Sequence, residues 1–339
     1  MNCVKYAVYL FDGTGQDYRN DDEKRDWSNI VRIHEFLHHS PQLSGKLLDM
    51  YGDGVGCRGN ETVFNEASGQ GLEERIEEAY YDIGGQVKEC RDDGDDLHVS
   101  VFGFSRGAYA ARVFCALIGY CGVPVTGSYY DAVRWTKNGD IDAVNKAIAS
   151  DSFIVHPEID FLGVFDTVAM TDVCKGVRIE RLPHNVKCAC HAMSYNERRA
   201  IFPISRFDPG QPNVEEVWFL GSHTDVGGGY RKRGLADYSL RWMIEKANEH
   251  GLAITESPII GDNAKDTAEF HNSGGFWYGV ASFFKKGHIH TDRMLRDGDL
   301  FHWSASDERA QFLSEKPSLP PETMIAYTSR KRENVTAIA

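Results

Sequence analysis

The chain has 339 residues, of which 42% are hydrophobic, 26% charged and 12% aromatic, and this composition is typical of a folded globular protein rather than a disordered one. Its 50 acidic residues outnumber its 37 basic ones, for a formal net charge of −13. That balance argues against generic binding to nucleic-acid backbones, which needs clustered Lys and Arg, and leaves open only a local basic face.

The chain is long enough to bury one large core. We expect a catalytic core over residues 1–250, then an extension over residues 251–339 that packs on it as a cap or pocket wall and ends in a flexible tail. No window approaches the roughly eighteen apolar residues of a membrane-spanning helix, and the first residues lack the pattern of a signal peptide. The eight cysteines are scattered, which favours free thiols and synthesis in the cytoplasm.

Apolar runs alternate with amphipathic segments along the chain. The apolar runs predict strands at residues 3–10, 47–51, 97–102, 159–165 and 216–222. The amphipathic segments predict helices at residues 29–39, capped by Ser28, and at 72–90, after 105, at 141–149 and at 235–250. This alternation predicts an α/β fold, with a mostly parallel sheet flanked by helices and a less regular C-terminal segment.

A Gly-x-Gly-x-x-Gly pattern over residues 54–59 follows the second predicted strand. A dinucleotide-binding fingerprint would open directly into a helix. Residues 60–71 are polar and interrupted by glycine, so we interpret the pattern as a loop that closely approaches neighbouring backbone.

The third predicted strand runs into Gly103-Phe104-Ser105-Arg106-Gly107, which is Gly-x-Ser-x-Gly, and then into a helix rich in small residues. Glycines on both sides of the serine suit a sharp turn from strand to helix, because side chains there would collide with the strand or the helix. Such a turn exposes the hydroxyl of Ser105, which makes this residue the candidate nucleophile.

Two further strands end at titratable residues, Asp166 and His223. Strand ends on one sheet meet at one edge, so Ser105, Asp166 and His223 can converge. Their order of nucleophile, acid and base is that of the α/β-hydrolase arrangement. In such a triad the imidazole accepts the proton of the serine hydroxyl, and the carboxylate fixes and stabilises the imidazole.

The negative oxygen that develops during acyl transfer needs hydrogen-bond donors. The backbone N–H of Arg106 and one from the loop at Gly13 and Thr14 are the natural pair. We expect Asp12 to order that loop and Asp225 to brace the loop of His223, although Asp225 also competes with Asp166 as the acid.

Three alternatives remain open at this point. A metal-dependent hydrolase could use Asp12, Asp166, His223 and Asp225 around one hard cation. The chain could instead be a non-catalytic interaction module of the same fold. Zinc ligation is a further possibility, although the spacing in Cys-x-Cys-His is unusual for zinc and buried free thiols are the default; the residues concerned are Cys174, Cys188, Cys190 and His191.

Several blocks together resemble one family of α/β-hydrolase domains of unknown function, which includes phospholipase effectors of bacterial type VI secretion. A further block, at residues 191–199, is similar to another of the family's blocks but has Asn196 where aspartate is more usual. The resemblance spans roughly residues 4–300; its main blocks are residues 10–14, 103–108, 163–168 and 221–230.

The resemblance implies a Ser105–Asp166–His223 triad and hydrolysis of carboxylic esters without a cofactor, with phospholipids as the best-known substrates. It also implies a secretion apparatus or an immunity protein as partner, and delivery into a target cell. Secreted lipases of the family often carry long additional segments that engage membranes, for which this chain has little room.

An aromatic stretch at residues 276–284 either closes the core or lines an acyl pocket.

Overall fold

The computed structural model describes residues 3–14, 16, 27–54, 70–124, 154–169, 177–255, 271, 292–306 and 326–328. The helices within these residues are α1 (Asn29–His38), η2 (Pro41–Leu43), α3 (Gln70–Asp93), α4 (Arg106–Cys121), α7 (His223–Gly227), α8 (Gly234–Glu249) and η4 (Trp303–Ala305). The strands are β1 (Val4–Phe11), β2 (Leu47–Gly52), β3 (Asp96–Phe104), β4 (Val123–Pro124), β5 (Ile154–Val155), β6 (Phe161–Phe165), β7 (Ala189–Ser194), β8 (Val214–Phe219), β9 (Leu300–Phe301) and β10 (Ala326–Tyr327).

The centre of the fold is an eight-stranded sheet in the order β10-β9-β8-β7-β6-β3-β1-β2. Every neighbouring pair in it is parallel. Parallel strands need crossover connections, and here helices supply several of them. The predicted α/β-hydrolase-like fold is therefore confirmed.

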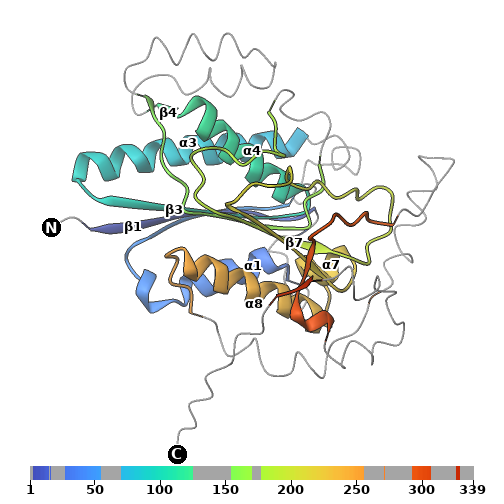
Figure 1. Ribbon diagram of the computed structural model, residues 1–339. Coiled ribbons are helices and arrows are strands. Elements are labelled where there is room, and N and C mark those ends of the chain that lie inside the picture. Colours follow the sequence, from blue (N-terminus) through green and yellow to red (C-terminus); the bar gives the residue numbers. More distant parts are fainter. Residues whose placement is uncertain are drawn as a thin grey trace, which may run out of the picture.

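Helices cover both faces of the sheet (Figure 1). Helices α3 and α4 bury their apolar residues against one face, and the side chain of Tyr9 points to that side. Helices α1 and α8 cover the other face, where Val8 and Leu10 point. Successive residues of β1 thus enter opposite cores, as the two-residue period of a strand requires.

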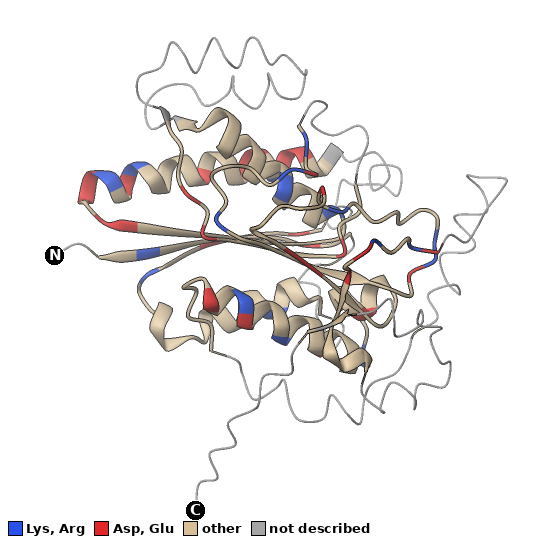
Figure 2. Cartoon of the chain, in the orientation of Figure 1, with Lys and Arg blue, Asp and Glu red and all other residues tan. Residues whose placement is uncertain are grey.

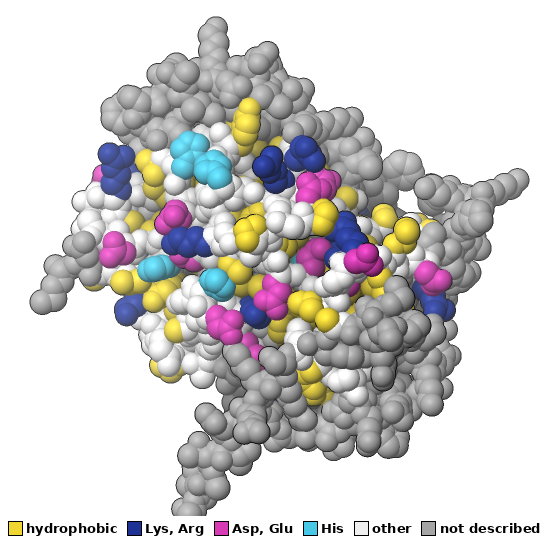
Figure 3. Space-filling model, in the orientation of Figure 1, with side chains coloured by type: hydrophobic (Ala, Val, Ile, Leu, Met, Phe, Trp, Pro, Cys, Tyr) yellow, Lys and Arg dark blue, Asp and Glu magenta, His cyan; other side chains and the backbone are white. Residues whose placement is uncertain are grey.

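Charged residues are concentrated outside the sheet. Figure 2 shows them along helices such as α3, whereas the middle of the sheet carries few. On the face shown in Figure 3, acidic and basic side chains are interspersed among the described residues. In the same part of the chain, no helix combines the length and apolar character needed to cross a lipid bilayer.

Local sequence patterns predict most of these elements well. Helix α1 begins after Ser28 as expected, because the Ser28 hydroxyl accepts a hydrogen bond from the Val31 N–H at 3.1 Å. Strand β7 was not predicted, because Ala189–Ser194 is short and contains His191 among its apolar residues. The predicted helix at 141–149, the aromatic stretch at 276–284 and most of the glycine loop at 54–59 lie outside the described residues.

Strands β9 and β10 come from the predicted extension and join the main sheet beside β8. The division of the chain near residue 250 stays a prediction.

Candidate active site

Ser105 lies at the turn between β3 and α4 with φ 59° and ψ −122°, a conformation that non-glycine residues rarely adopt. A Cβ atom on Gly107 would lie 2.3 Å from the Phe11 carbonyl oxygen, and one on Gly103 would lie 2.6 Å from the Gly107 carbonyl oxygen. Both glycines therefore allow a close approach between helix and strands that any side chain would prevent.

The structure brings Ser105, His223 and Asp166 into one chain of hydrogen bonds. Ser105 Oγ lies 2.8 Å from His223 Nε2, and His223 Nδ1 lies 2.6 Å from Asp166 Oδ2. The three residues follow β3, β8 and β6, and all three are buried. When Nδ1 carries the proton, Nε2 is free to accept the hydroxyl proton of Ser105.

The carboxylate of Asp166 has two further donors. The Ser194 N–H, at the end of β7, donates to Oδ1 at 2.8 Å. Arg293 donates to Oδ1 through Nη1 and to Oδ2 through Nη2 at 2.9 Å. Burial acts to raise the pKa of Asp166, but Arg293 and His223 outweigh it and hold the pKa below its usual value. The group is therefore a carboxylate at neutral pH.

The imidazole of His223 lies between two phenylalanine rings. The Phe202 ring stacks on it with centroids 4.9 Å apart and an interplanar angle of 11°, and Phe104 lies at 4.7 Å. The guanidinium of Arg199 stacks in turn on Phe202, 4.3 Å from the ring centroid. These contacts fix the plane of the imidazole.

Asp225 braces the first turn of α7, which begins at His223. Its Oδ2 accepts hydrogen bonds from the N–H and the hydroxyl of Ser222, both at 2.9 Å, in a capping box. Its Oδ1 lies 2.7 Å from His271 Nδ1. Asp166, and not Asp225, is the carboxylate in contact with His223.

Asp12 holds the loop that follows β1. Its Oδ2 accepts hydrogen bonds from the hydroxyls of Ser28 and Tyr51, at 2.7 and 2.6 Å. Its Oδ1 accepts one from the Gly13 N–H at 2.6 Å. The Gly13 N–H is thus bound to Asp12, and the oxyanion donor that the sequence predicts from the loop at Gly13 and Thr14 stays a prediction. Thr14 is the other predicted donor from this loop.

Comparison with known proteins identifies the family. A family model described as the catalytic domain of Tle1-like phospholipase effectors of the type VI secretion system (T6SS) matches residues 5–246. The chain belongs to this family. The resemblance seen in the sequence blocks is therefore confirmed, whereas no curated protein matches the chain.

Two solved structures align with this Tle1-like chain over part of their length. An uncharacterised protein from Pseudomonas aeruginosa aligns with a TM-score of 0.53 and 17% identity, over 85% of this chain and 52% of that one. The structure of the Tle1 effector bound to the VgrG spike aligns with a TM-score of 0.41 and 21% identity, over 68% of this chain and 52% of that one. The chain thus corresponds to about half the length of either protein.

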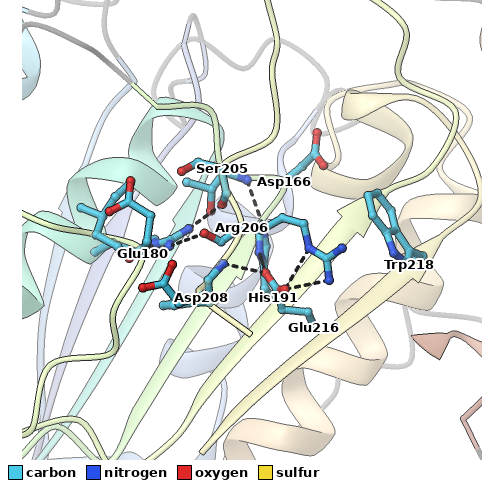
Figure 4. A network of polar contacts seen from close by, with 12 residues as sticks. Asp166, Glu180, His191, Ser205, Arg206, Asp208, Glu216 and Trp218 are labelled. Atoms are coloured by element: carbon cyan, nitrogen blue, oxygen red, sulfur yellow. Dashed lines mark hydrogen bonds and ion pairs between the residues drawn. The ribbon is translucent and has the colours of Figure 1, made fainter. Parts of the chain in front are cut away.

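A second polar network lies beside Asp166 in the Tle1-like domain (Figure 4). The Thr167 N–H donates to His191 Nε2 at 3.1 Å, so the other ring nitrogen carries the proton and donates to Glu216 at 3.0 Å. Glu216 also binds Arg206, and Arg206 forms two hydrogen bonds with Asp299. Burial lowers the pKa of His191, which favours its neutral form.

The alternative metal sites do not assemble within the described residues. Asp12, Asp166, His223 and Asp225 do not gather into one ligand group there. Cys174 lies outside the described residues, and Cys188 and Cys190 are free thiols that face the core under α8. His191 faces the opposite side of β7, where it packs on Phe207, and both its ring nitrogens are bound.

Sequence reasoning missed three contributors to this site, Arg293, Phe202 and Ser194. No local pattern marks Arg293, which contacts a residue 127 positions earlier. Ser194 donates through its backbone, so its residue type carries no signal. Phe202 follows the sequence block at 191–199, and its position near that block is the one hint available.

Proposed function

We propose that this chain is a serine hydrolase that cleaves carboxylic esters, and that its substrate is a phospholipid. The observation that carries the proposal is the hydrogen-bonded series from Ser105 Oγ through His223 to Asp166, at 2.8 and 2.6 Å. Membership of the Tle1-like phospholipase effector family supports the substrate class.

In the proposed reaction Ser105 Oγ attacks the ester carbonyl carbon, and its proton passes to His223 Nε2. The tetrahedral intermediate then collapses, the alcohol leaves with the proton from His223, and an acyl-enzyme remains on Ser105. Water attacks the acyl-enzyme by the same route and releases the fatty acid. Asp166 stays ionised throughout and stabilises the imidazolium.

The negative oxygen of each tetrahedral intermediate needs two donors. The backbone N–H of Arg106, at the first position of α4, is one of the pair that we propose. The other is the N–H of Thr14, since the Gly13 N–H donates to Asp12. Under this proposal Asp12 acts indirectly, by holding the loop that presents Thr14.

We further propose that the protein acts as an antibacterial effector delivered into a target cell. A Tle1 effector has been solved bound to the VgrG spike of the secretion system. By analogy, a component of the secretion apparatus is the proposed partner here, and an immunity protein in the producing cell is a second one.

Labelling with a fluorophosphonate probe tests the nucleophile. Wild-type protein is expected to label, Ser105→Ala is expected not to, and Ser44→Ala, which alters an exposed serine, is the matched control. If folded wild-type protein fails to label, the non-catalytic module becomes the better explanation.

Substrate class is tested with vesicles of defined phospholipids, lysophospholipids and short p-nitrophenyl esters, with Ser105→Ala beside wild type. We expect release of fatty acid that depends on Ser105 and continues in EDTA. Activity that survives Ser105→Ala but is lost in EDTA would instead establish the metal-dependent alternative. If only the short esters are hydrolysed, the result supports a serine esterase but contradicts the proposal that the substrate is a phospholipid.

A further inference from the structure

Two histidines of α1 and one aspartate of β2 bring their polar atoms together, away from Ser105. His34 and His38 are four residues apart, so they lie on the same side of the helix. Asp49 lies on β2, the edge strand beside β1. The Nε2 atoms of the two histidines lie 3.2 Å apart, and they lie 3.0 and 3.1 Å from Asp49 Oδ2.

These three distances form a nearly equilateral triangle, which is the arrangement that three ligands of one metal ion adopt. An ion about 2.0 to 2.1 Å from each ligand holds neighbouring ligand atoms roughly 2.9 Å apart in octahedral geometry and roughly 3.4 Å apart in tetrahedral geometry. The observed 3.0 to 3.2 Å falls between these values. One ion can therefore contact all three atoms without a large movement of either element.

The donor set favours a particular class of ion. Imidazole nitrogens suit Zn²⁺, Ni²⁺, Cu²⁺ and Co²⁺, whereas Mg²⁺ and Ca²⁺ prefer sites made of oxygen atoms. The side chains of His34 and Asp49 are 13% and 15% exposed, and that of His38 is 50% exposed. An ion can enter from solvent at His38, and water can fill its remaining coordination positions.

We propose that His34 Nε2, His38 Nε2 and Asp49 Oδ2 bind one divalent transition-metal ion of the zinc class. The ion would link α1 to the edge strand β2 and so stabilise the folded state by mass action. It would also lie close to Tyr51, a residue that holds the Asp12 loop in place. The His34 ring is 5.4 Å from the ring of Tyr51, and the Tyr51 hydroxyl donates to Asp12.

The test is isothermal titration of tag-free, chelator-stripped full-length protein with Zn²⁺, in wild type and in His38→Ala. His38 is half exposed, so its truncation leaves the fold intact. We expect one Zn²⁺ per chain in wild type and an affinity about tenfold or more lower in His38→Ala. The matched control is His39→Ala, because the neighbouring His39 is 72% exposed and binds the Glu35 carbonyl; its affinity should equal that of wild type.

Two further measurements make the outcome decisive. Co²⁺ should give a visible absorption spectrum in wild type and His39→Ala that is lost in His38→Ala. Zn²⁺ should raise the melting temperature of wild type but not that of Asp49→Asn. Absence of saturable Zn²⁺ binding, equal affinity in His38→Ala and His39→Ala, or equal binding of Mg²⁺ would each overturn the proposal. None of these readouts depends on ester hydrolysis.

Discussion

Arg293 and Asp166 form a buried, bidentate ion pair on the Nδ1 side of the His223 imidazole. Arg293 Nη2 donates to Asp166 Oδ2 at 2.9 Å, and this same oxygen lies 2.6 Å from His223 Nδ1. The Arg293 side chain is 5% exposed and that of Asp166 is fully buried. A positive charge therefore compensates the carboxylate in the resting state, before any proton reaches His223.

Replacing Arg293 with glutamine should destabilise the fold, because it leaves a buried carboxylate without its counter-charge. We expect the free energy of unfolding to fall by roughly 3 kcal/mol or more in chemical denaturation. The pKa of Asp166 should also rise, because the positive charge of Arg293 helps to hold it below its usual value. Arg296→Gln, in the same segment but 41% exposed, should change stability by less than about 1 kcal/mol. Equal stability of the two variants would contradict the prediction.

Gly107→Ala should lower the stability of the fold, whereas Gly85→Ala should be well tolerated. A Cβ on Gly107 would lie 2.3 and 2.4 Å from the carbonyl oxygens of Phe11 and Asp12, so helix α4 would have to move. Gly85 lies within α3 with nothing within 4 Å of such a Cβ, and Gly85→Ala should raise stability by about 0.5–1 kcal/mol. Melting temperatures of the pair test this, and a stabilised Gly107→Ala would count against the close approach.

Leucine in place of Phe202 should slow the chemical step more than it weakens substrate binding. The Phe202 ring stacks on His223, and an aromatic face stabilises a cation such as the imidazolium that forms during the reaction. The cation–π contribution of about 0.5–2 kcal/mol corresponds to a fall in kcat of roughly two- to thirtyfold. Steady-state kinetics separate kcat from KM, and a rise in KM alone would be the opposite result.

Glutamine in place of Glu216 should reduce the acid sensitivity of the fold. Burial acts to raise the pKa of Glu216, but its hydrogen bond with His191 and the nearby Arg206 lower it from 4.5 to about 2. Because the pKa is lower in the folded state than in the unfolded state, ionised Glu216 stabilises the fold at pH values above 4.5. This stabilisation is lost as the pH falls from 4.5 towards 2. Urea unfolding at several pH values in this window should show that the free energy of unfolding falls less with decreasing pH in Glu216→Gln than in wild type.

The adjacent Glu215 supplies the control for that experiment. It points away from His191 and pairs with Lys246 at 2.6 Å at a partly exposed site. Glu215→Gln should therefore show the same acid dependence as wild type. An unchanged slope in Glu216→Gln would place the acid sensitivity elsewhere in the fold.

The sequence alone predicts the parts of the site that depend on local patterns. The glycines around Ser105 and the strand endings at Asp166 and His223 are visible because each lies where an apolar run stops. The parallel sheet then brings these endings to one edge, so their meeting follows from topology. Whether these residues perform the predicted catalysis stays a prediction.

The remaining parts depend on tertiary contacts that leave no local signal. Arg293 contacts Asp166 from a segment without a predicted element, and strands β9 and β10 are each two residues long. The binding of the Gly13 N–H by Asp12 depends on side-chain orientation, which spacing does not reveal. His34 and His38 are spaced as ligands, but their partner Asp49 comes from the edge strand, which only the fold identifies.

The order of strands in the sheet also bears on how the chain is made. From β3 onward, each later strand of the main sheet joins next to the one before it, through β6, β7, β8, β9 and β10. During synthesis the sheet can therefore grow at one edge, and every new strand covers the unpaired backbone left by its predecessor. Arg293 lies between β8 and β9 in the sequence. Most strands of the sheet are therefore synthesised before Arg293 is available to pair with the carboxylate of Asp166.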